Sequence, residues 1–308
     1  MLLARLLFLF LHSFIISCEF VFASEGKGAR ILFIHIPKTG GESIKNSLRE
    51  VKGFTFWQHR AYKWDEYVEN EVENSVSLPK NLILEHHTKT KPISQIQDDL
   101  VKLKNLWDRR GLTHFEFIVV REPIKLHESL YSWCSKKLIN KRKISLPKLW
   151  HNIVPCTMPN FMSSYLEDGR WGCGGQHKAR NLTQSCDIPR VKFWLNEFEI
   201  YDLSELSKLR KDLNEKIIVG NQGKNSLIKP FSRANRSRIL DESRFAKKGL
   251  SELSSINCRY SEYAQHKINS DLNKFSNDAP NGSSRVKKLR DLHVSCDTLL
   301  YDEIRLGL

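Results

Sequence analysis

One glycine-containing segment, which follows an apolar run near residue 30, has the residue types of an anion-binding loop. It reads Ile34-His-Ile-Pro-Lys-Thr-Gly-Gly-Glu-Ser43. Glycines let the backbone approach a ligand closely, and the first N–H groups of a following helix would point at it. Lys38 adds a positive charge, and Thr39 and Ser43 add hydroxyl donors. A turn between a strand and a helix with a surface lysine is the simpler alternative.

The order of lysine and glycines separates this segment from a well-known phosphate loop. In the nucleotide-triphosphatase P-loop the lysine follows the glycines. Here Lys38 precedes Gly40 and Gly41. The segment therefore indicates an anion site of another kind.

Arg121 is a second candidate for anion binding. It ends the apolar run 117–120 and precedes Glu122 and Pro123. An arginine at the carboxyl end of a strand in an α/β sheet lies where ligands bind, and its planar guanidinium can hold a phosphate through two hydrogen bonds. Ser129, six residues into a helix that starts near Pro123, could reach the same anion. Alternatively, Arg121 pairs with a nearby carboxylate such as Glu122.

The apolar pattern predicts the elements that would position these residues. Four β-branched and aromatic runs predict buried strands, at residues 29–36, 81–85, 114–120 and 216–220. Apolar residues at helical spacing predict helices, at residues 43–51, 98–107, 123–134 and 202–213, with a last helical part ending at 299–301. Because strands alternate with helices, we expect one α/β domain over residues 24–308, with a central parallel sheet, flanking helices on both faces and the ligand at the carboxyl ends of the strands.

Two stretches show no such pattern. Residues 54–80 are polar and aromatic without a clear period. Residues 136–192 are rich in Lys, Pro, Gly and Cys, which predicts an irregular insertion held by a disulfide.

The charge and the N-terminus narrow the classes of partner. The chain has 308 residues and a formal net charge of +14, which favours anionic partners such as nucleic acid, a membrane surface, a phosphorylated cofactor or a sulfated polysaccharide. Residues 1–23 have a short positive start that ends at Arg5 and continue as a mostly apolar run, as in a signal peptide or signal-anchor. Glu19 disfavours a stable membrane span, and a buried core helix is a third alternative. The first two would direct residues 24–308 into the secretory pathway.

Sequons and cysteines agree with a secretory-pathway location. Asn181, Asn235 and Asn281 begin Asn-x-Ser/Thr sequences. An even number of cysteines in an oxidising compartment suggests disulfides, and we expect the pairs Cys173–Cys186 and Cys258–Cys296. No Cys-x-x-Cys spacing occurs, so we expect no metal site. Nucleic acid is also not expected as a partner. The cysteines after Cys18 are Cys134, Cys156, Cys173, Cys186, Cys258 and Cys296.

Together the two anion-binding segments resemble motifs of the Golgi carbohydrate sulfotransferases, the family that contains heparan sulfate 2-O- and 6-O-sulfotransferases. That family binds 3′-phosphoadenosine 5′-phosphosulfate (PAPS) through His-Ile-Pro-Lys-Thr-Gly-Gly-x-Ser and Val-x-Arg-Asp/Glu-Pro-x5-Ser-x-Tyr. The resemblance is sharp over residues 31–51 and 115–135, and loose over 81–88 and 213–222. It implies a P-loop-like sulfotransferase fold and the transfer of a sulfuryl group from PAPS to a hydroxyl of a glycan or proteoglycan, without a metal.

The resemblance implies roles for individual residues. Lys38 would stabilise charge on the leaving phosphate oxygen, and Arg121 and Ser129 would hold the 3′-phosphate. At Glu42 the family usually has threonine or serine, so we expect this carboxylate to point away and Ser43 to make the hydroxyl contact. The cofactor-binding set implied is Pro37, Lys38, Thr39, Gly40, Gly41, Glu42, Ser43, Arg121 and Ser129.

Sulfuryl transfer also needs a base for the proton of the acceptor hydroxyl, and histidine suits this role near neutral pH. Glu85, His86 and His87 end a predicted strand between the two motifs, where the heparan sulfate 2-O enzymes have their catalytic histidine. We choose His87, with His86 or Glu85 next. Alternatively, these are exposed polar residues at the end of a strand. We expect His35 to be a packed strand residue.

Several further expectations stay open at this level. The basic stretch 224–248 covers the nucleotide, forms a track for a polyanion, or is a solvated surface. The expected location is the Golgi lumen, as a type II membrane protein or, after cleavage, as a secreted one. The acceptor could also be a protein tyrosine or a small metabolite. Other functions compatible with the pattern are a non-catalytic protein that binds sulfated glycans and a nucleotide phosphotransferase.

Overall fold

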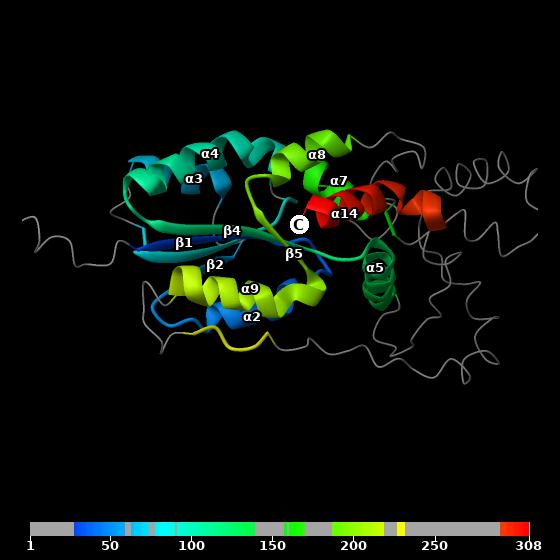
Figure 1. The fold of residues 1–308 in the computed structure, drawn as a ribbon, viewed down its shortest axis with the longest axis horizontal. Helices are drawn as coiled ribbons and strands as arrows, with labels where there is room; N and C mark the ends of the chain where they lie inside the picture. Colours follow the sequence, from blue (N-terminus) through cyan, green and yellow to red (C-terminus); the bar gives the residue numbers. More distant parts are fainter. Residues whose placement is uncertain are drawn as a thin grey trace, which may run out of the picture.

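Five parallel strands form the centre of the fold, in the order β2-β3-β1-β4-β5 (Figure 1). This confirms the predicted α/β class and the central parallel sheet. The computed structural model describes residues 28–58, 63–73, 78–89, 91–138, 157–158, 160–169, 187–218, 227–231 and 290–307. The strands are β1 (Ala29–Ile34), β2 (Thr55–Gln58), β3 (Asn81–His86), β4 (Thr113–Val120) and β5 (Glu199–Asp202).

Helices cover both faces of the sheet, because alternate side chains of the strands pack in opposite directions. Leu32 and Ile34 of β1 pack in a core with α3, α4, α7, α8 and α14, whereas Ile31 and Phe33 pack in a second core with α2 and α9 (Figure 1). The helices are α2 (Gly41–Arg49), α3 (Trp64–Glu73), α4 (Ile93–Arg109), α5 (Pro123–Leu138), α7 (Phe161–Asp168), α8 (Ile188–Leu195), α9 (Leu206–Leu213) and α14 (Ser295–Gly307).

The strand predicted at residues 216–220 is wrong. Residues 214–218 form a π-helical turn that continues α9, and Ile217 and Ile218 face the core. A short apolar run signals burial, and its period does not distinguish a buried strand from a buried helical turn. The edge strands β2 and β5 were missed because their apolar signal is weak. Each has only four residues, and the side chains of β2 are partly exposed.

The predicted irregular insertion at residues 136–192 is wrong in its described part. That part contains α7 and the start of α8. Phe161, Met162, Tyr165 and Leu166 recur at helical spacing and are buried in the core that α7 shares with α4, α8 and α14.

Several sequence predictions fall outside the described residues. They include the leader at 1–23, the three sequons and most of the basic stretch 224–248. Cys296 forms a disulfide, but Cys173, Cys186 and Cys258 lie outside the described residues, so the pairings Cys258–Cys296 and Cys173–Cys186 stay predictions. Within the described ranges, none of the helices combines the length and the apolar composition needed to cross a bilayer.

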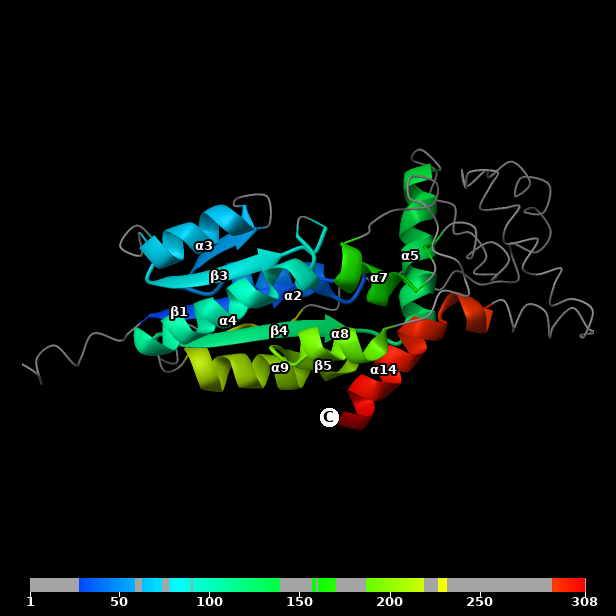
Figure 2. The ribbon, with the colours of Figure 1, turned by 90° about the horizontal axis from the view of Figure 1, so that it is seen from above.

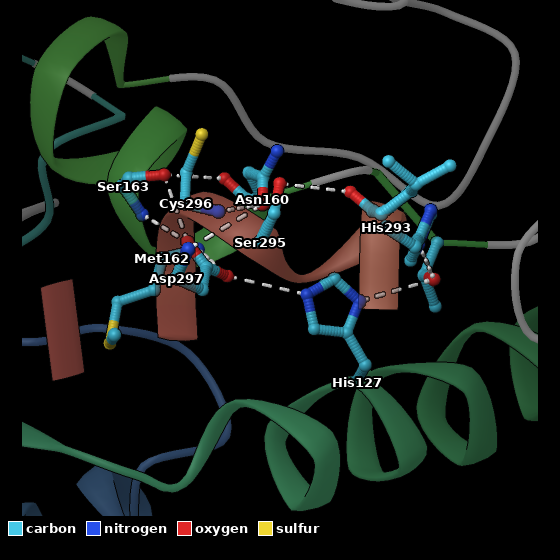
Figure 3. A network of polar contacts seen from close by, with 10 residues as sticks. His127, Asn160, Met162, Ser163, His293, Ser295, Cys296 and Asp297 are labelled. Atoms are coloured by element: carbon cyan, nitrogen blue, oxygen red, sulfur yellow. Dashed lines mark hydrogen bonds and ion pairs between the residues drawn. The ribbon is translucent and has the colours of Figure 1, made fainter. Parts of the chain in front are cut away.

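A buried polar network joins α14 to α5 and α7 (Figure 3). The Asp297 carboxylate accepts hydrogen bonds from the backbone N–H groups of Met162 and Ser163, at 2.9 and 2.8 Å, and from Nε2 of His127 at 3.3 Å. Burying a carboxylate is costly unless its oxygens accept hydrogen bonds. These bonds therefore fix α14 against the helix that carries Ser129, and both α5 and α7 lie beyond the carboxyl ends of the strands (Figure 2).

Replacing Asp297 with alanine should destabilise the protein strongly. Asp297→Ala leaves the N–H groups of α7 and the His127 ring without their shared acceptor, so we expect a loss of about 3–5 kcal/mol in the free energy of unfolding, measured by urea denaturation. The control is Asp291→Ala, which removes an exposed carboxylate just before α14 and should change stability by less than about 0.5 kcal/mol. Equal losses in the two variants would contradict the role of the network.

Candidate functional site

The predicted site residues come from three adjacent strands. The loop 37–43 follows β1, Glu85 and His86 end β3 with His87 directly after it, and Arg121 follows β4. The strand order places β1 between β3 and β4, and the backbone N–H of His35 donates to the carbonyl of His86 at 2.8 Å. The chain leaves β1 toward α2 on one face and β3 toward α4 on the other. Such a switch point is where open α/β sheets bind ligands.

The loop after β1 is held in an unusual backbone conformation. Lys38 has φ of 71°, which costs about 1–2 kcal/mol for a residue with a side chain. The Thr39 hydroxyl donates to the carbonyl of Ile36 at 2.7 Å and is fully buried. Thr39 therefore uses its hydroxyl proton to stabilise the turn. The sequence analysis had expected that proton to be offered to a ligand.

The two glycines are required by close neighbours. A Cβ atom at Gly40, whose φ is 91°, would lie 2.5 Å from Leu203 Cδ1, and one at Gly41 would lie 1.8 Å from Nε2 of His35. Gly41 therefore lets the His35 ring lie directly under the start of α2. Within the described ranges, the N–H groups of Gly41 and Glu42 donate to no backbone carbonyl, as expected for the first turn of a helix.

Arg121 lies against the loop. Its Nη1 donates to the carbonyl of Lys38 at 3.0 Å. Within the described part of the chain Arg121 forms no ion pair, and Glu122 pairs instead with Lys125 at 3.2 Å. Burial lowers the pKa of the guanidinium, although the charges of Glu122, Glu128 and Asp202 raise it. A half-buried arginine without an ion pair is costly and is well suited to an anionic ligand.

The remaining residues of the proposed cofactor set differ in exposure. The side chain of Glu42 is exposed and pairs with Lys45, whereas Ser43 is buried in the first turn of α2. Pro37 is buried, and Ser129 is half-buried on α5. Among the described residues no hydrogen bond joins Ser129 to Arg121, so the role of Ser129 stays a prediction.

Behind the loop, a carboxylate lies between two histidines. Nδ1 of His35 is 2.6 Å from Oε1 of Glu85, and Nε2 of His87 is 3.5 Å from the same oxygen. The two rings have centroids 4.4 Å apart. Glu85 is 1% exposed, so the sequence alternative of exposed polar residues at the end of a strand is wrong for this carboxylate.

Tyr165 holds the ring of His87 in place. Its hydroxyl donates to the backbone carbonyl of His35 at 3.2 Å and lies 3.0 Å from Nδ1 of His87. This contact orients the ring so that its other nitrogen, Nε2, faces the Glu85 carboxylate.

The charges in this cluster follow from burial and hydrogen bonding. Burial by itself raises the pKa of Glu85, but the hydrogen bonds and charges of His35 and His87 outweigh it and hold that pKa well below its usual range. Burial lowers the pKa of His87, and the nearby Glu85 carboxylate opposes this shift. The cluster therefore contains an ionised carboxylate beside an imidazole that is neutral near pH 7.

His86 points to a different environment from His87. It is 1% exposed, its Nε2 lies 2.9 Å from the carbonyl of Lys91, and its ring packs edge-on against Trp64 at 5.0 Å. His87 is the more accessible ring, with 16% of its side chain exposed. The geometry favours His87 over His86 as a base.

Two residues of the site were missed at the sequence level. Tyr165 lies in the stretch taken as irregular, although its helical spacing from Phe161 was a usable signal. Lys45 is 13% exposed, and its charge lowers the pKa of His87. It follows Gly41 by one helical turn, so a helical wheel would have placed it near the loop.

No model of a known protein family matches the chain, and neither a curated protein nor a solved structure matches it. An α/β fold by itself does not determine function, because many activities use similar folds. The function must therefore be inferred from the geometry of the site and from the two motifs.

Gly41→Ala tests the contact between the loop and the His35 ring. The added methyl group would overlap Nε2 of His35, so we expect a loss of about 1–3 kcal/mol in the free energy of unfolding, measured by chemical denaturation. Combining it with His35→Ala should recover part of that loss, because the ring is then absent. Gly307→Ala, in open space at the end of α14, is the control and should have little effect. An unchanged stability for Gly41→Ala would exclude this packing.

Proposed function

We propose that the protein is a PAPS-dependent sulfotransferase that transfers a sulfuryl group to a hydroxyl of a glycan or proteoglycan. The observation that carries the proposal is the hydrogen bond from Arg121 to the carbonyl of Lys38. It brings together the two segments that resemble the two PAPS-binding motifs, which are 83 residues apart in the chain.

The charges around the loop support a ligand with two anionic groups. The N-terminus of α2 favours negative charge, and Lys38 lies in the turn before it. Arg121 supplies a separate cation without an ion pair in the described ranges. In the proposal the loop holds the 5′-phosphosulfate, and Arg121 with Ser129 holds the 3′-phosphate. The finer fold assignment, a P-loop-like sulfotransferase fold, is part of the same proposal.

The proposed chemistry assigns one role to each polar group. An acceptor oxygen attacks sulfur, the bond from sulfur to the phosphate oxygen breaks, and Lys38 stabilises the negative charge left on that oxygen. Nε2 of His87 takes the proton of the acceptor hydroxyl and later releases it to water. Glu85, at 3.5 Å, stabilises the imidazolium that forms, and the Tyr165 hydroxyl, 3.0 Å from Nδ1, holds the ring in place. No metal is needed for these steps.

The proposed location rests on features of the amino-acid sequence. The leader, the sequons and the +14 charge support a protein of the Golgi lumen, anchored as a type II membrane protein or secreted, that acts on polyanionic glycans. Assay of the purified chain with radiolabelled PAPS and a panel of glycans tests the activity. Heparin binding without turnover on any glycan would favour a non-catalytic glycan-binding protein. Stabilisation by ATP–magnesium but not by 3′-phosphoadenosine 5′-phosphate would favour a phosphotransferase.

Arg121→Ala tests the assignment of the 3′-phosphate. Loss of a charged hydrogen-bonding group costs about 1.5–3 kcal/mol, so PAPS should bind at least about tenfold more weakly. Adenosine 5′-phosphosulfate, which lacks the 3′-phosphate, should lose much less affinity, as measured by calorimetry. Arg109→Ala, an exposed arginine at the end of α4, is the matched control and should bind both as the wild type does. Equal losses for the two ligands would refute the assignment.

Glu85→Gln should change the pH dependence of turnover. His87 accepts a proton only when neutral, so kcat falls as the pH decreases through its pKa. Because the Glu85 carboxylate raises that pKa, its removal should shift the acidic limb of the kcat profile to lower pH and lower the plateau. His87→Ala should lower kcat by about 10²–10⁴-fold at every pH.

The control for the pH profile is Glu116→Gln. Glu116 pairs with His114 on β4, at 2.9 Å. The variant Glu116→Gln should therefore leave the acidic limb of the kcat profile at the pH of the wild type. An unshifted limb in Glu85→Gln, or a larger loss of kcat in His86→Ala than in His87→Ala, would show that the base was wrongly assigned.

A further inference from the structure

The cluster behind the loop has the composition of a transition-metal site. One nitrogen from His35, one nitrogen from His87 and one oxygen from Glu85 all lie within 4.8 Å of one another. Two imidazoles and one carboxylate are a ligand set that suits zinc and its neighbours among the divalent transition metals. This observation does not depend on the sequence motifs or on sulfuryl transfer.

The spacing of the donor atoms is close to what a tetrahedral ion requires. Bonds of about 2.0–2.1 Å at tetrahedral angles separate two donors by about 3.3 Å. Nε2 of His87 and Oε1 of Glu85 are 3.5 Å apart. Nδ1 of His35 is only 2.6 Å from that oxygen, because it donates a hydrogen bond there. The proton of His35 therefore occupies the position in which an ion would bind.

The ring of His87 is already oriented for coordination. Its Nδ1 lies 3.0 Å from the hydroxyl of Tyr165, and its Nε2 faces Glu85 at 3.5 Å. When Nε2 binds an ion, Nδ1 carries the proton, and a histidine ligand normally donates that N–H to an oxygen such as this one. Tyr165 is itself fixed, because its backbone carbonyl accepts from Thr88 at 2.6 Å.

The backbone of the cluster is rigid, but one side is open. His35 directly follows β1 and Glu85 lies in β3, two paired strands at the centre of the sheet. His35 and Glu85 are buried, whereas 16% of the His87 side chain is exposed. An ion could therefore enter beside His87, and water could complete its coordination, as in zinc sites with three protein ligands.

We propose that His35, Glu85 and His87 form a site for a divalent transition metal, with Zn²⁺ as the best fit. The ion binds Nδ1 of His35, a carboxylate oxygen of Glu85 and Nε2 of His87, with water in the fourth position. The Nδ1 proton of His35 leaves to solvent, and the ring stays neutral by taking a proton on Nε2. The metal is not a reactant. It would bind Nε2 of His87, which the proposed sulfuryl transfer needs as a base, so metal binding and catalysis exclude each other.

Calorimetric titration of the full-length chain with Zn²⁺ alone, without donor or acceptor, tests the site. We expect one ion per chain in the wild type and at least a tenfold weaker affinity in both Glu85→Gln and His87→Ala. His114→Ala is the matched control, because His114 also lies between two carboxylates, at 2.9 and 3.0 Å from Glu116 and Asp108. The affinity of this variant for Zn²⁺ should match that of the wild type. Co²⁺ should give the intense visible absorption of a tetrahedral site in the wild type and not in His87→Ala.

Three results would overturn the proposal. They are no Zn²⁺ binding by the wild type, equal affinity in the wild type and both site variants, or loss in His87→Ala without loss in Glu85→Gln. Thermal unfolding of each variant checks that it is folded, and His87→Gln replaces His87→Ala if the latter unfolds. Because no sulfate donor is present, inactivity toward PAPS would leave this test intact, and absence of metal binding would leave the proposed enzyme intact.

Discussion

The candidate site depends on the pairing of β1 with β3 on one side and β4 on the other. This pairing sets residues from three distant parts of the chain at one edge of the sheet. It continues one residue beyond β1, where the N–H of His35 donates to the carbonyl of His86. That bond fixes the point at which the chain leaves the sheet, and so it fixes the positions of the glycine turn and of the His35 ring.

Several features near this edge of the sheet reduce the stability of the folded state. Lys38 has a positive φ, Arg121 is half-buried, and Glu85 is fully buried. Each is stabilised locally, the turn by Thr39, the guanidinium by the carbonyl of Lys38, and the carboxylate by two histidines. Strained and charged groups concentrate at functional sites, since stability alone would favour apolar side chains there.

The histidine cluster can bind a proton or a metal ion with the same atoms. An imidazole nitrogen beside an ionised carboxylate accepts a proton readily, and the same two groups are ligands for a divalent cation. In both cases Nε2 of His87 faces Glu85, because Tyr165 holds the ring from its Nδ1 side. Competition between proton transfer and metal binding follows directly from this geometry.

The sequence by itself determined the parallel α/β class, the strand–turn–helix unit around Lys38, and the placement of Arg121 at the end of a strand. These properties follow from local apolar periods and from glycine and proline chemistry, which act over a few residues. It could not determine that residues 216–218 are helical, because burial makes both kinds of element apolar. Only the tertiary structure revealed the different surroundings of His86 and His87, the contact of Tyr165 with His87 and the contact of Arg121 with Lys38. Each of these depends on side chains that strand pairing brings together across many residues of chain, and no local pattern records such distances.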